Sequence, residues 1–171
     1  MGNYQSGAGA FSLLQSTDVP TYAQSGMMSN YSLHVDVTTA DASIGATDLY
    51  ELAYSVEGYD FTQIAGDDVT LSFWVKSDVI GIYGVGMQNS GADRGYTSEY
   101  EIFVADTWEK KTVIVPMTET GGTWDYVNGT GLLMLFPFAA GSNYQFTKDQ
   151  WNASASASTS NQVNLMASTG S

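Results

Sequence analysis

The chain contains no cysteine, and His34 is its only histidine. The absence of cysteine excludes a disulfide-stapled scaffold, a thiolate metal site and a cysteine nucleophile. A single histidine excludes the multi-histidine centres that hold zinc or iron. Any site chemistry must therefore come from carboxylates, hydroxyls, amides, aromatic rings and a few basic groups.

Basic residues are scarce: five Lys and Arg stand against 18 Asp and Glu, which gives a formal net charge of −13. A chain this acidic is not expected to bind nucleic acid through its phosphates or an anionic membrane through a polybasic patch. Charged residues make up only 13% of the chain, about half the usual share. The polar surface must therefore consist mainly of uncharged side chains.

Long apolar runs are also missing. The longest, at 131–140, contains Pro137 and is too short to span a bilayer. The first residues carry neither the basic group nor the apolar run of a signal peptide. We expect a soluble protein without a transmembrane segment, folded as one domain over residues 1–171. Residues 1–25 are expected to be loosely ordered, and the Ser- and Ala-rich segment 152–161 to form a surface loop.

What the chain does have is an alternation of apolar and polar residues with a period of two, at 31–38, 50–57 and 69–76. This period predicts half-buried β-strands. A helical turn is expected at 59–65, closed by Gly66. Short strands without intervening helices predict an all-β protein, an antiparallel two-sheet β-sandwich. Further strands are expected at 80–88, 98–105, 108–117, 131–138 and 162–166.

An ordered series of short motifs resembles a jelly-roll module that is common in bacteriophage tail-fibre and other virion proteins. The resemblance covers residues 40–170, and part of it is also similar to carbohydrate-binding modules attached to glycoside hydrolases. Both families imply a jelly-roll β-sandwich and sugar recognition rather than turnover. The motifs are Glu-Gly-Tyr-Asp-Phe (57–61), Leu-Ser-Phe-Trp-Val-Lys-Ser (71–77), Gln-Asn-Ser-Gly-Ala-Asp-Arg-Gly-Tyr (88–96), Glu-Tyr-Glu-Ile (99–102), Asp-Thr-Trp-Glu-Lys-Lys-Thr (106–112) and Gly-Thr-Trp-Asp-Tyr (122–126).

The resemblance therefore implies a non-catalytic phage virion module, a tail or head fibre that adheres to glycans of the bacterial surface. Its partners would be such a glycan and other virion subunits, and its location the virion. Two alternatives stay open: a structural spacer or decoration domain without a ligand, and a carbohydrate-binding module of a glycoside hydrolase. Fold likeness alone does not decide between them, because β-sandwiches serve many functions.

The expected ligand site combines aromatic rings, which stack on the apolar face of a sugar, with polar groups for its hydroxyls. Trp74 stands opposite the apolar face of its strand, and residues 89–96 bring a ring together with an amide, a carboxylate and a guanidinium. The alternative is that Trp74 covers an edge of the sandwich and Arg94 braces its loop by pairing with Asp93 or Glu99. The candidate ligand-binding residues are Trp74, Asn89, Asp93, Arg94, Tyr96 and Glu99.

Catalysis is not expected. Glu99 and Glu101 share one face of a predicted strand about 7 Å apart, a spacing open to an inverting glycosidase. We interpret them as two solvated carboxylates, since nothing indicates an apolar pocket that would raise one pKa. His34 and Asp36 share a strand face, but no Gly-x-Ser-x-Gly nucleophile elbow accompanies them.

A structural calcium ion is the one cofactor that the sequence suggests. Asp67 and Asp68 lie in an expected turn, and Asp41 and Asp48 lie in another loop. Carboxylate oxygens in loops are the ligands that Ca²⁺ prefers. The spacing of an EF-hand is absent.

Members of the resembled families usually continue past the position of Gly170 with one more strand. The resemblance therefore implies that a strand at 10–15 lacks a neighbour. An open strand edge is a template for pairing with another chain. We expect either a homo-oligomer that covers the gap or a frayed N-terminal segment.

Overall fold

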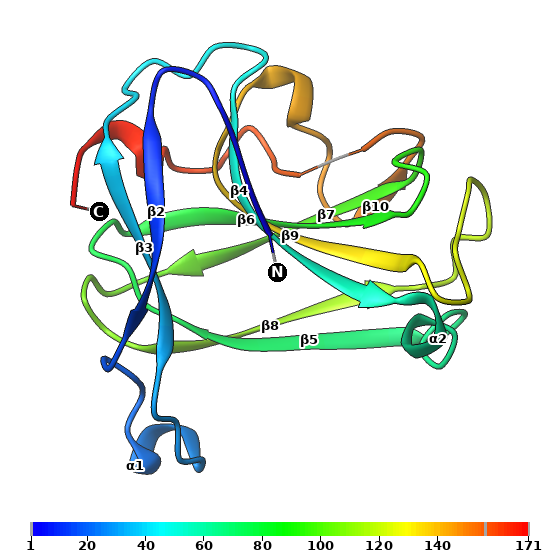
Figure 1. Cartoon of the computed structure of the whole chain (residues 1–171), viewed down its shortest axis with the longest axis horizontal. Helices are drawn as coiled ribbons and strands as arrows, with labels where there is room; N and C mark the ends of the chain where they lie inside the picture. Colours follow the sequence, from blue (N-terminus) through cyan, green and yellow to red (C-terminus); the bar gives the residue numbers. More distant parts are fainter. Residues whose placement is uncertain (1, 156, 171) are drawn as a thin grey trace.

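The computed structural model describes residues 2–155 and 157–170 and is mostly β (Figure 1). Met1, Ser156 and Ser171 belong to the expected domain but lie outside the described residues. The short helical elements are α1 (Tyr22–Ser25), α2 (Gly58–Phe61) and the 3-10 turns η1 (Ser142–Tyr144) and η2 (Leu165–Ala167). The strands are β1 (Gly2–Ser6), β2 (Ala10–Ser16), β3 (Ser32–Thr39), β4 (Leu49–Glu57), β5 (Asp68–Val75), β6 (Gly81–Asn89), β7 (Gly95–Ile102), β8 (Glu109–Pro116), β9 (Thr130–Ala140) and β10 (Gln150–Asn152).

Six strands form one antiparallel sheet in the order β1-β4-β9-β6-β7-β10. Two separate antiparallel pairs, β2–β3 and β5–β8, form the other layer. Both pairs cover the same face of the large sheet. Every second residue of β6 shares that face: Tyr83 packs with β2 and β3, whereas Val85 and Met87 pack with β8. The result is a sandwich-like, all-β arrangement (Figure 1).

The period-two pattern places the core between these layers. Along β8, Lys111, Val113 and Val115 are buried, while the residues between them face the solvent. On β5, the Phe73 ring meets the rings of Tyr100 and Phe136 edge-on, at centroid distances of 5.1 and 5.3 Å. Such edge-to-face pairs add to the stabilisation that comes from burying the rings.

The structure confirms strands at all the expected positions except one. Residues 162–166, expected to be a strand, run instead into η2. The Asn164 side chain accepts a hydrogen bond from Met166 N at 2.9 Å and so caps that turn. Asparagine competes in this way for backbone donors that a strand would need.

Two segments are tied into the structure more closely than their composition suggests. Within residues 2–25, β1 pairs with β4 and β2 pairs with β3, so the strand at 10–15 has a neighbour on one side. In the segment 152–161, Ala157, Ser158 and Thr159 are buried rather than exposed. None of the helices in the described parts of the chain is long and apolar enough to cross a membrane.

Candidate functional site

The structure distributes the six predicted ligand residues over separate places. Trp74 lies near the end of β5 and, like Trp108, lines a groove between the two strand pairs. Asn89, Asp93 and Arg94 lie at the turn between β6 and β7, at the opposite end of these strands (Figure 1). Tyr96 and Glu99 follow on β7. The expected convergence of Trp74 with the 89–96 loop is therefore not found.

The polar groups of the β6–β7 turn are used to hold the turn. Asn89 is buried; its Nδ2 donates to Asp93 Oδ1 at 2.6 Å, and its Oδ1 accepts from the backbone N–H of Asp93 and Arg94. The Asp93 carboxylate also accepts from Thr123 N at 3.0 Å. The hydrogen bonds from Asn89 and then Thr123 lower the pKa of Asp93. Arg94 Nε lies 3.7 Å from Glu119 Oε1, so Arg94 braces the turn through a partner that the sequence did not suggest.

Tyr96 belongs to the core. Its side chain is 3% exposed, and its ring packs 5.6 Å from the ring of Trp151. A sugar cannot stack on this ring without opening the sandwich. The inward direction follows from alternation, because Tyr96 shares a face of β7 with Tyr100 and Ile102.

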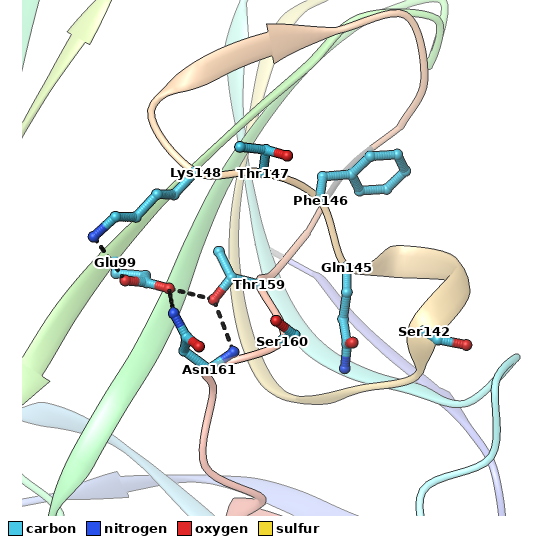
Figure 2. A pocket seen from close by; sticks show the side chains of 9 residues that line it. All are labelled: Glu99, Ser142, Gln145, Phe146, Thr147, Lys148, Thr159, Ser160 and Asn161. Carbon is cyan, nitrogen blue, oxygen red and sulfur yellow. Dashed lines mark hydrogen bonds and ion pairs between the residues drawn. The ribbon is translucent and has the colours of Figure 1, made fainter.

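Glu99 has the opposite orientation, on the outer face of β7, where it anchors a polar pocket (Figure 2). Its Oε1 accepts from Thr159 Oγ1 at 2.5 Å and from Asn161 Nδ2 at 2.9 Å, and its Oε2 accepts from Lys148 Nζ at 3.1 Å. Burial acts to raise the pKa of Glu99, but the hydrogen bonds from Thr159, Lys148 and Asn161 together outweigh it and lower the pKa. The carboxylate is thus held ionised and in one orientation.

Two chain segments wall this pocket of about 570 Å³. The segments are 142–148 and 159–161. Backbone hydrogen bonds join the first to Ser158, which directly precedes the second: Phe146 N to Ser158 O at 2.8 Å and Ser158 N to Tyr144 O at 3.1 Å. Figure 2 shows side chains of both segments, with Lys148, Thr159 and Asn161 gathered at Glu99 and the ring of Phe146 pointing away from that cluster. The residues that line the pocket are Glu99, Ser142, Gln145, Phe146, Thr147, Lys148, Thr159, Ser160 and Asn161.

Sequence reasoning found only Glu99 of this set. Thr159, Ser160 and Asn161 lie in the low-complexity segment, where neighbouring Ser and Ala residues conceal them. The signal that was available is Phe146-Thr-Lys148, a ring beside one of only five basic residues, in a stretch without strand alternation.

The aspartates considered as calcium ligands do not meet. Asp67 and Asp68 are exposed at the start of β5. Asp41 is buried and accepts a hydrogen bond from Tyr50 Oη at 2.7 Å, and Asp48 accepts one from Gly45 N. Within the described residues, no group of three or more His, Asp or Glu side chains is arranged to hold a metal ion.

Comparisons of the chain with protein-family models, with curated proteins and with solved structures found no match in any of the three. The motif series at 57–126 is thus the sole support for the virion and carbohydrate-binding resemblance.

Proposed function

We propose that this protein is a non-catalytic binding module that adheres to neutral, hydroxyl-rich glycans through the Glu99 pocket. The observation that carries the proposal is an open hollow in which an ammonium group, an amide and a hydroxyl are already fixed on one carboxylate, with an aromatic ring, further hydroxyls and a second amide in the lining. On the strength of the motif resemblance, we propose further that the module is a jelly roll of a phage tail or head fibre and that its ligand lies on the bacterial surface.

Sugar hydroxyls are both donors and acceptors, so a site that selects them needs both kinds of group in set positions. Glu99 and the Gln145 carbonyl oxygen supply acceptors, and Lys148, whose side chain is 54% exposed, supplies donors. Because three hydrogen bonds already orient Glu99, a ligand would spend little free energy on ordering it. Phe146 offers a face for the C–H side of a pyranose ring.

The charge balance favours a neutral ligand. Glu99 and Lys148 neutralise each other inside the pocket, and the net charge of −13 repels polyanionic glycans. A shallow site of this kind binds one sugar weakly, roughly at millimolar dissociation constants, and several copies on a fibre would raise the avidity by about 10²-fold or more.

The state of Glu99 supports binding without turnover. A glycosidase needs one carboxyl group whose raised pKa keeps it protonated as a general acid. The hydrogen bonds to Glu99 lower its pKa instead. Glu101, two residues along the same face, is exposed to solvent.

The first prediction tests this site with an array of bacterial-surface glycans and multivalent display of the protein. We expect specific, saturable binding without hydrolysis. Lys148→Met should weaken it by about tenfold, the loss of one charge-assisted hydrogen bond. The matched control is Lys110→Met, since Lys110 is exposed on β8, away from the pocket.

If the wild-type protein binds no glycan on the array, the glycan proposal is overturned and a structural spacer is favoured. Equal losses in Lys148→Met and Lys110→Met would remove the Glu99 pocket as the site. Turnover that disappears in Glu99→Gln would show that the protein is an enzyme.

A further inference from the structure

A groove of about 720 Å³ lies between the two strand pairs of the second layer. One wall is β3 with Leu33, His34 and Val35, and the other is the end of β5 with Trp74. This groove is independent of the Glu99 pocket and shares no residue with it. Its floor is the inner face of the large sheet, formed by Leu52, Tyr83, Tyr100, Ile102, Phe136 and Phe138.

Both walls present strand edges to the groove. Within the described residues, β3 forms a ladder with β2 alone, and β5 forms one with β8 alone. Val37 O accepts a hydrogen bond from Gly170 N at 3.0 Å, from outside the β2–β3 ladder. Because backbone groups alternate between the two sides of a strand, the carbonyls of Val35 and Leu33 point to the same side as that of Val37.

We propose that this groove binds an extended strand of a separate polypeptide, which joins β3 to β5 and makes the second layer continuous. Such strand addition derives affinity from backbone hydrogen bonds and specificity from alternate side chains. The floor is apolar, so the alternate side chains that face it must be apolar. The opposite side chains face solvent and are expected to be polar.

The charged residues that line the groove indicate the charge of the strand that it binds. Asp18, Asp78 and Asp106 line the groove, against one lysine, Lys76. Asp18 is already engaged, with the Lys76 ammonium group and with Trp108 Nε1 at 2.9 Å. Asp78 and Asp106 are exposed at the end of the groove beyond β5. The structure therefore favours a strand with basic flanks, and the net charge of −13 disfavours a second copy of this chain.

The second prediction uses a synthetic peptide, Lys-Val-Thr-Val-Thr-Val-Thr-Lys with blocked ends, titrated into the full chain. Binding is followed by calorimetry and by the fluorescence of Trp74 and Trp108, which line the groove. We expect saturable binding that is at least about tenfold weaker for the same peptide with Glu at both ends. Methylation of either set of alternate backbone nitrogens should abolish binding, because one set of N–H groups faces β3 and the other faces β5.

The controls separate strand addition from adhesion to an apolar patch. A peptide of the same composition with its Val residues consecutive must bind much more weakly. Asp78→Asn should reduce the preference for Lys over Glu flanks, and Asp60→Asn, exposed on α2, should leave it unchanged. Equal binding of all peptides, or no binding of any, would overturn the proposal. A dimer in light scattering that the peptide does not dissociate would overturn it in favour of self-association.

Discussion

Glu51 is the residue whose position is hardest to reconcile with its chemistry. It lies in the middle of β4, between β1 and β9, opposite Tyr4 on one side and Pro137 on the other. Its side chain is 8% exposed, and its Oε2 has no hydrogen-bond partner within the described part of the chain. Burial raises the pKa of Glu51 from 4.5 to about 7. The folded state therefore favours the protonated carboxyl group.

The third prediction concerns stability against pH. A carboxyl pKa that is raised in the folded state contributes stability fully below pH 4.5 and loses it as the pH rises through about 7. The loss amounts to roughly 3 kcal/mol at most, at about 1.4 kcal/mol for each unit of pKa difference. Denaturant unfolding between pH 5 and 8 should show this decline in the wild type and a flatter profile in Glu51→Gln. Glu57→Gln, exposed on the same strand, is the control; a slope shared by wild type and Glu51→Gln would contradict the prediction.

At the scale of elements, the strands could be predicted from the sequence, but the packing of the segment 152–161 against them could not. Alternation at 31–38, 50–57 and 69–76 predicts the strands themselves, because it depends only on neighbouring residues. It matches the burial along most of β5, but in β4 the residues 49–52 are all buried and Tyr54 is exposed. The burial of Ser158 depends instead on Gly84, which is remote in the sequence. A Cβ atom on Gly84 would lie 2.7 Å from Ser158 Oγ. Small side chains in 152–161 thus indicate close packing, although the same composition is typical of a surface loop.

The fourth prediction follows from that packing. Gly84→Ala would also bring the new methyl group within 2.7 Å of Gln162 Oε1, so the segment that carries Thr159 and Asn161 must move. We expect a loss of about 1–3 kcal/mol in unfolding free energy, as in other overpacked sites, together with weaker glycan binding. Gly2→Ala is the matched control, since nothing lies within 4 Å of its Cβ position. Unchanged stability and binding in Gly84→Ala would show that the segment is not held against the sheet.

At the scale of the whole molecule, the sequence predicted an all-β antiparallel protein but not all of its open edges. The resemblance implied an open edge beside residues 10–15; within the described residues β2 pairs with β3 alone, but the groove lies on the other side of this pair, between β3 and β5. The predicted ligand residues are dispersed for a reason that also lies in the arrangement of the strands. Trp74 and the 89–96 loop are close in sequence, but β5 and β6 run in opposite directions and carry them to opposite ends. Only the arrangement of the strands in space determines such distances.

The fifth prediction uses the net charge of −13. Added salt shortens the Debye length from about 10 Å at 0.1 M to about 3 Å at 1 M. Binding of the Lys-flanked peptide to the acidic end of the groove should weaken as salt is added. Binding of a neutral glycan should change by less than about twofold. Titrations of both ligands over one salt series check this, and equal salt sensitivity of the two would contradict the assignment of charge to the groove.

The split second layer also has a consequence for amide hydrogen exchange. The β2–β3 and β5–β8 pairs share no strand ladder and pack mostly on different core clusters. Few contacts link them directly: Val75 packs against the β2–β3 cluster, and Asp18 bonds Lys76 and Trp108. Each pair is therefore able to open as its own cooperative unit, with its own free energy of opening. A strand bound in the groove would link the two units. Amide exchange in β8, which such a strand does not contact, would then become slower on binding. This slowing would show that the two pairs open together as one unit.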